Sequence, residues 1–89
     1  AELHGTYIEL NGTGLLDGLG HAHLGCCIDN TDFYEFFGGA SDSLRKTGEA
    51  WGLMNAPLIE DGHIAPPDGP GWGAEWDEEK LHSLIVEEL

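Results

Sequence analysis

Residues 6–37 read TYIELNGTGLLDGLGHAHLGCCIDNTDFYEFF, and this stretch decides which class of fold the chain can adopt. Residues 6–10 are rich in β-branched and aromatic side chains, which predicts a strand that the glycine-rich loop of residues 11–14 closes. In residues 15–28 apolar side chains recur at the three- and four-residue spacing of a helix with a broad apolar face. Residues 32–37 predict a second, short strand. This order is typical of an α/β fold, which needs more strands than the stretch contains.

The carboxy-terminal half carries local signals of shorter elements. A polar helix is predicted within residues 41–52. Residues 57–65 predict a β-hairpin whose turn is formed by Asp61 and Gly62. Residues 66–73 are rich in glycine and proline and predict an extended loop that cannot be helical.

Both ends of the chain carry helix signals. Residues 1–5 resemble the last turn of a helix that Gly5 terminates, so we expect the chain to begin inside a longer protein. Asp77 is a favourable N-cap for a terminal helix, because its carboxylate can accept hydrogen bonds from free backbone N–H groups. The helix is predicted to bury one apolar stripe, formed by Leu81, Leu84, Ile85 and Leu89.

The charge balance is strongly acidic, with 17 Asp and Glu residues against three Lys and Arg residues and a formal net charge of −14. Nucleic acid and anionic membranes are excluded as partners, because both are bound by clustered Lys and Arg. The acidity fits a halophilic protein from a host with high internal salt. It also fits a local acidic surface on a larger protein. We favour the first interpretation because acidic residues occur along the whole chain.

The cysteine content and hydropathy predict a cytoplasmic protein. Cys26 and Cys27 are the only cysteines, and we expect both to be small buried side chains in a reducing compartment. The chain contains no apolar run of the roughly 18–20 residues that a membrane span requires.

Two stretches resemble one enzyme family. Residues 61–77, DGHIAPPDGPGWGAEWD, are similar to the carboxy-terminal tail of the mandelate racemase and muconate-lactonizing enzymes of the enolase superfamily. Residues 22–30, AHLGCCIDN, followed by DFYE at 32–35, resemble the last barrel helix of that family and the segment after it, with Asp29 where proline is common. The two motifs occur in the family's order and, with the preceding strand, cover nearly the whole chain.

The resemblance implies an α/β fold in which the chain supplies the last strand and helix of a (β/α) barrel and a tail that returns to the capping domain. Residues 1–37 would be the end of the barrel domain, and residues 38–89 the tail with its hairpin, loop and terminal helix. The remaining N-terminal part of the same enzyme would be the partner of this segment, and the full enzyme would be a homo-oligomer.

The activity implied by the resemblance is a lyase or isomerase reaction on a small carboxylate. The full enzyme would remove the α-proton of its substrate with the help of Mg²⁺, which residues outside this segment would bind. Dehydration of a sugar acid is the preferred reaction; racemization and cycloisomerization are the alternatives within the superfamily. This segment alone would be inactive. A different class of function, a stand-alone acidic module that binds cations without catalysis, also stays open.

The candidate substrate-binding residues are Asn11, Gly12 and Thr13. By the resemblance they lie at the carboxyl end of the final barrel strand, where polar groups would hydrogen-bond a hydroxylated substrate. No residue of this segment is assigned to catalysis or to a metal. Asp17 is interpreted as a helix-dipole or solvated residue.

Other polar and aromatic side chains receive structural interpretations. His21 and His23 would point in different directions on a helix, one packed and one exposed, so they would not share an ion. Trp51, Trp72 and Trp76 could line a sugar site, but Trp72 and Trp76 are predicted instead to clamp the tail loop to the barrel and capping layers.

Overall fold

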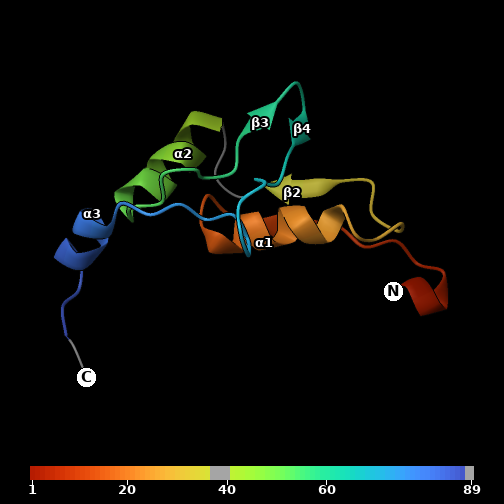
Figure 1. The fold of residues 1–89 in the computed structure, drawn as a ribbon. Coiled ribbons are helices and arrows are strands. Elements are labelled where there is room, and N and C mark those ends of the chain that lie inside the picture. Colours follow the sequence, from red (N-terminus) through yellow and green to blue (C-terminus); the bar gives the residue numbers. More distant parts are fainter. Residues whose placement is uncertain (37–40, 88–89) are drawn as a thin grey trace.

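A computed structural model describes residues 1–36 and 41–87 of the chain. The molecule is elongated, 46 × 31 × 22 Å along its principal axes, with its two termini at opposite ends (Figure 1). Its elements, in chain order, are a 3-10 turn (Glu2–His4), β1 (Leu10–Gly12), α1 (Leu16–Gly25), β2 (Tyr34–Phe36), α2 (Ser41–Ala50), β3 (Ile59–Glu60), β4 (His63–Ile64) and α3 (Glu78–Ser83).

The centre of the fold is a strand–helix–strand unit. β1 and β2 pair in parallel, with Asn11 opposite Glu35, and α1 connects them. Parallel strands require such a crossover, because a tight turn can only join antiparallel neighbours. Residues 6–36 therefore form the α/β unit that the sequence predicts. β2 lies within residues 32–37, where the sequence predicts a second, short strand.

The elements of this unit are shorter than predicted. The first strand begins at Leu10 and not at Thr6. Among the described residues, Ile8 is the one residue of the segment 6–9 whose N–H bonds the segment that leads into β2, at the Asn30 carbonyl. The predicted loop residues Asn11 and Gly12 belong to the strand. The helix ends at Gly25 and not at residue 28. Just after its end, the Cys26 N–H is shared between the carbonyls of Ala22 and His23. Such three-centre bonds are common at helix ends.

The hydrophobic core joins α1 to the tail. Leu19 of α1 and Leu53 are fully buried, and Ala56 is 6% exposed. Leu16, Ala74 and Trp76 are packed against this cluster, half-buried. Burial of a Leu side chain stabilises by roughly 1.5–3 kcal/mol. The tail is thus held to the strand–helix–strand unit by apolar packing.

α2 approaches the core closely through Gly48. A Cβ at this position would lie 2.6 Å from Ala56 Cβ and 2.7 Å from the Gly14 carbonyl. The predicted polar helix therefore exists, and one glycine of it has a packing role. The side chains of Ser41, Asp42 and Leu44, the Phe37 end of the predicted strand and Leu89 of the predicted stripe lie outside the described part.

The tail follows its local signals. β3 and β4 form the predicted antiparallel hairpin, and the turn residues Asp61 and Gly62 both have positive φ, at 49° and 76°. Residues 66–73 form no helix, as predicted. Gly5 ends the first turn in the left-handed conformation, with φ 62°. All three outcomes rest on chemistry that lies within a few residues of sequence.

The extended segment of residues 73–77, which precedes α3, runs beside residues 52–55. Met54 N–H donates to the Glu75 carbonyl at 2.8 Å, and the Asn55 side chain bonds the carbonyl of Gly73 and the N–H of Glu75. This pairing holds the glycine- and proline-rich loop against the body of the protein. Trp76 packs on the core and Trp72 lies over Gly20 of α1, so both hold the tail loop to the α1 side of the fold.

The terminal helix begins as predicted but is shorter. The Asp77 carboxylate accepts from Lys80 N–H at 2.9 Å, which is the N-cap bond. The helix ends at Ser83, whereas the predicted stripe continues further. Leu81, Leu84 and Ile85 are 38%, 42% and 44% exposed. A short helix is stable mainly through packing of its apolar face, and this face has little to pack against among the described residues.

Candidate functional site

The carboxyl end of β1 is built around the absence of a side chain at residue 12. The Tyr34 hydroxyl occupies the space where a Cβ of residue 12 would be, at 2.0 Å, and donates a hydrogen bond to the Gly18 carbonyl at 3.2 Å. Tyr34 thereby ties β2 to the first turn of α1. Burial, with a smaller contribution from the Asp17 carboxylate, raises the pKa of Tyr34 to about 12, so the hydroxyl keeps its proton and its donor role near neutral pH.

The loop from β1 to α1 is closed by a Thr13–Asp17 cap. The Asp17 carboxylate accepts from the Thr13 N–H at 2.9 Å and from the Thr13 hydroxyl at 2.7 Å, and this hydroxyl accepts from Leu15 N–H at 3.3 Å. Partial burial acts to raise the pKa of Asp17. Hydrogen bonds from the Thr13 side chain and from the backbone of Thr13, Gly18 and Asp17 outweigh it and hold the pKa below 3.8. Asp17 therefore acts as a capping residue.

The cap predicts a specific acid response for the Asp17→Asn variant. The folded pKa of Asp17 lies below its unfolded value of 3.8, so its stabilising contribution is present above pH 3.8 and is lost as the pH falls through the folded pKa. We expect Asp17→Asn to cost about 0.5–1 kcal/mol at neutral pH, because a neutral acceptor is weaker and the site is solvent-screened. Urea midpoints from neutral pH down to below 3.8 should converge for the two proteins. Parallel curves would contradict the assignment.

Asn11 and Glu35 form a polar pair on the opposite face of the strands. Leu10 and Gly12 of β1 are buried and Asn11 between them is exposed, and Glu35 is exposed between half-buried neighbours. Residues in register on parallel strands share a face, and neighbours along a strand alternate. Because Tyr34 reaches α1 on one face, Asn11 and Glu35 lie on the face away from α1.

Of the three predicted substrate-binding residues, the structure leaves one free to contact a ligand with its side chain. The Thr13 hydroxyl is engaged by Asp17, and Gly12 has no side chain. Among the described residues, nothing hydrogen-bonds the Asn11 side-chain amide. Its backbone carbonyl accepts from His21 Nδ1–H. Sequence reasoning did not assign Glu35 to the site, although this residue lies in the family-like stretch DFYE at 32–35. The pairing of Glu35 with Asn11 depends on the strand register.

The histidines of α1 fix backbone and do not form a metal site. His21 donates to the Asn11 carbonyl, and His23 Nε2–H donates to the Trp72 carbonyl at 3.3 Å. Both are half-buried, whereas one packed and one exposed ring was predicted. They point to different partners, as expected for a helix. Within residues 1–36 and 41–87, no group of three or more His, Cys, Asp or Glu side chains could hold a metal ion.

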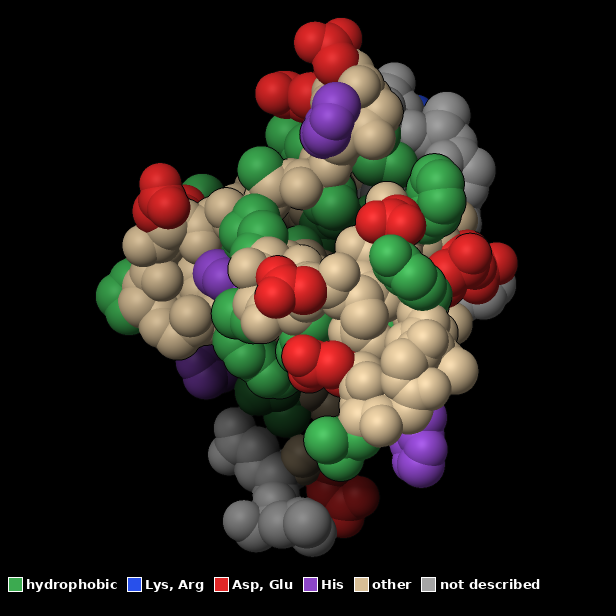
Figure 2. Space-filling view, turned by 90° about the vertical axis from the view of Figure 1, so that its right-hand side faces the viewer, with side chains coloured by type: hydrophobic (Ala, Val, Ile, Leu, Met, Phe, Trp, Pro, Cys, Tyr) green, Lys and Arg blue, Asp and Glu red, His purple; other side chains and the backbone are tan. Residues whose placement is uncertain are grey.

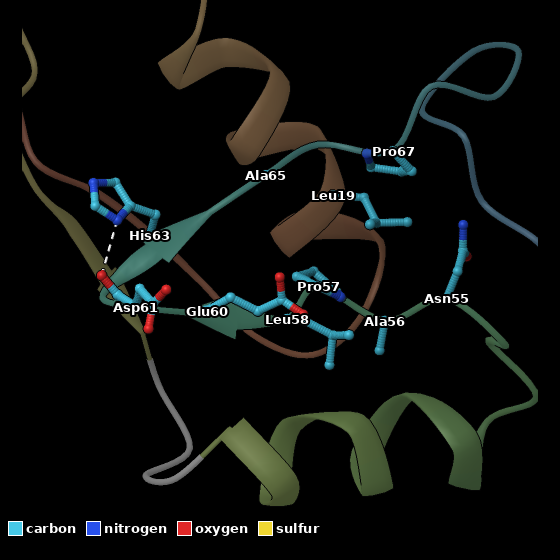
Figure 3. Close-up of a pocket in the computed structure, with 10 residues that line it drawn as sticks. All are labelled: Leu19, Asn55, Ala56, Pro57, Leu58, Glu60, Asp61, His63, Ala65 and Pro67. Carbon is cyan, nitrogen blue, oxygen red and sulfur yellow. Dashed lines mark hydrogen bonds between the residues drawn. The ribbon is translucent and has the colours of Figure 1, made fainter.

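A cleft of about 510 Å³ lies between the hairpin, α1 and the tail (Figure 3). Its wall is apolar where Leu19, Ala56 and Pro67 line it, and Glu60 and Asp61 belong to the hairpin side. The His63 ring donates to the Asp61 carbonyl at 2.9 Å, and the Asn55 amide is used by the tail. The polar groups of this cleft are thus either bonded within the protein or carboxylates of one sign, and they form no acid–base pair.

The surface shows the acidity of the composition. Asp and Glu side chains are scattered over the face seen in Figure 2, with apolar side chains exposed between them. An ion pair joins Arg45 and Glu49 on α2 at 3.6 Å. Cys26 and Cys27 are free and exposed, which corrects the prediction that both are buried. The reason is that α1 ends before them, so its buried face does not include their side chains.

The geometry defines an α/β protein whose parallel strand pair has a helix on one face and exposed polar residues on the other. The family described as Enolase C-terminal domain-like matches residues 1–80. The chain therefore belongs to this family, which indicates an enzyme family. A search of curated proteins and a search of solved structures each gave no match. In the part of the chain that the structure describes, every helix is too short or too polar to cross a membrane.

Proposed function

We propose that this chain is the carboxy-terminal portion of an enzyme that removes the α-proton of a carboxylate substrate, with dehydration of a sugar acid as the reaction. Family membership and one structural observation support the proposal. The observation is the register of β1 and β2, which places Asn11 and Glu35 side by side on the strand face that α1 leaves uncovered.

The parallel pair suits a place in a (β/α) barrel. In such a barrel the helices lie outside, the opposite strand face points inward, and active sites form at the carboxyl ends of the strands. A two-stranded sheet is only marginally stable by itself, so β1 and β2 fit a larger sheet completed by the N-terminal part of the enzyme. β1 and β2 would then be two successive strands of that barrel, with β2 the later one.

Within this proposal Asn11 and Glu35 would contact the hydroxyl groups of a sugar acid. The amide of Asn11 can donate and accept hydrogen bonds, whereas the carboxylate of Glu35 only accepts them. Gly12 and Thr13 would act indirectly. Gly12 admits the Tyr34 ring, and Thr13 is held in the cap with Asp17, so both keep the end of β1 in place.

The described residues do not fit a metal, because no group of three or more of their His, Cys, Asp and Glu side chains could hold one. We therefore assign no magnesium ligand and no metal-dependent step to this chain. Magnesium, if the whole enzyme uses it, would be held by residues of the preceding part.

The proposal is tested by exchange of the substrate α-proton in D₂O, followed by NMR, in the full protein that contains this chain. A panel of sugar acids and simpler α-substituted carboxylates is the probe. Exchange with formation of a keto acid is the expected result, and exchange without it would select racemization or cycloisomerization. Absence of exchange for every compound in the panel would overturn the proposed function.

Two variants test the site itself. Asn11→Ala and Glu35→Gln are each expected to lower kcat/KM about tenfold, the effect of losing roughly 1.4 kcal/mol of hydrogen bonding in the transition state. Glu2→Gln removes an exposed carboxylate from the amino-terminal turn and is the matched control, with unchanged kcat/KM. Equal effects of all three substitutions would show that the site does not lie at β1 and β2.

A further inference from the structure

Cys26 and Cys27 form an exposed pair of adjacent thiols. Both are free and exposed, and they directly follow Gly25, the last residue of α1. Cys26 still has right-handed helical angles, with φ −76° and ψ −11°, and Cys27 N–H bonds the Leu24 carbonyl at 2.9 Å. Exposed thiols can react in the native protein, whereas buried ones are inert.

The spacing of the pair disfavours a disulfide between the two sulfurs. Adjacent Cα atoms are about 3.8 Å apart across a trans peptide. Disulfides usually span Cα atoms about 4.4–6.8 Å apart, and shorter spans store strain. A bridging atom between the two sulfurs makes the closed ring larger, which relaxes this constraint. The pair is therefore better suited to ligation of one thiophilic centre than to a disulfide between its own two sulfurs.

The surroundings of the pair select the kind of centre. Structural zinc sites are almost always completed by four protein ligands. Among the described residues, no third His, Cys, Asp or Glu joins the two cysteines. A trivalent arsenic atom that carries one organic substituent needs only two sulfur ligands.

We propose that Cys26 and Cys27 together are a binding site for a trivalent organic arsenical. In the reaction the As=O group condenses with the two thiols. Two As–S bonds form, the two S–H bonds and the As–O bonds break, and the oxygen leaves with both thiol protons as water. Arsenic stays trivalent, and no oxidant or reductant takes part. The site lies at the end of α1 opposite the β1–α1 loop and is independent of the proposed catalytic function.

The test uses phenylarsine oxide on the native protein, with intact-mass spectrometry and a thiol count. The expected result is one arsenical per chain and loss of both free thiols. Cys26→Ser and Cys27→Ser should each lose the adduct although one thiol remains, and circular dichroism should show that both variants are folded. A dithiol should release the arsenical, while the same concentration of a monothiol should not.

Two results would overturn the proposal. One is an adduct that forms after unfolding in urea but not on the native protein, because the thiols would then be covered. The other is an adduct of equal stability on either single-cysteine variant, because the pair would then have no role. Binding of Zn²⁺ in preference to the arsenical, measured by competition, would also contradict the argument from ligand number.

Discussion

Gly12→Ala is expected to destabilise the protein by about 3 kcal/mol, at the upper end of what overpacking usually costs. The added Cβ would lie 2.0 Å from the Tyr34 hydroxyl oxygen and 3.0 Å from the Gly18 Cα. The first contact cannot persist, so Tyr34 must move and lose its bond to the Gly18 carbonyl. Denaturant unfolding followed by circular dichroism measures the change in the free energy of unfolding.

A second substitution distinguishes this mechanism from a general intolerance of the strand. Tyr34→Phe removes the atom that collides at 2.0 Å and leaves contacts at 3.0 Å. The double variant Gly12→Ala/Tyr34→Phe should therefore be more stable than Gly12→Ala alone, which is the sign of two coupled neighbours. If Tyr34→Phe adds its own cost to that of Gly12→Ala, the collision is not the cause.

Gly20→Ala is the matched control for a glycine in the same unit. A Cβ there would meet the Trp72 ring at 3.5–3.7 Å, which is ordinary contact, and Gly20 lies inside α1. Replacement of glycine by alanine within a helix favours folding by about 0.5–1 kcal/mol. We expect Gly20→Ala to be neutral or stabilising under the same conditions.

Leu19→Ala is expected to cost about 3 kcal/mol, within the 2–5 kcal/mol range for truncation of a buried leucine. Leu19 has no exposed surface and packs with Leu53 and Ala56, so its loss opens a cavity where α1 meets the tail. Because the core is small, this one side chain is a large part of it. Urea unfolding with tryptophan fluorescence is a suitable measurement, since Trp76 packs against the cluster.

The position of Leu19, and not its residue type, sets this cost. Leu24→Ala truncates the same residue type in the same helix at a site that is 43% exposed, and it should cost less than half as much. Leu19→Ala/Leu53→Ala should cost less than the sum of the single variants, because the two side chains share one cavity. Similar costs for Leu19→Ala and Leu24→Ala would contradict the assigned core.

Several features of the fold could be predicted from sequence because their cause lies within a few residues. The hairpin follows from the tolerance of Asp61 and Gly62 for positive φ, and the start of α3 follows from the Asp77 carboxylate. The ends of β1 could not be predicted in this way. A strand ends where its neighbour ends, and that neighbour, β2, lies more than 20 residues away.

In the candidate site, too, some features could be predicted from nearby residues and others depended on residues far away in the sequence. The resemblance to the family placed Asn11 at the carboxyl end of a strand, and the structure shows its side chain exposed at that position. The hydrogen bonds from Thr13 to the Asp17 carboxylate could not be predicted, because the same residue types also occur in loops without such bonds. The hidden Tyr34 contact at Gly12 and the exposed pair at Cys26 and Cys27 required three-dimensional packing.

The sequence by itself determined the family, the α/β class of residues 6–37 and the local caps and turns, since these depend on residue order and short-range backbone preferences. Only the tertiary structure decided that Glu35 lies beside Asn11. A shift of one residue in the pairing of two strands moves every side chain to the other face, and neither strand taken alone specifies that register. The Tyr34 hydroxyl, seated against Gly12 and bonded to Gly18, is the long-range contact that specifies it here.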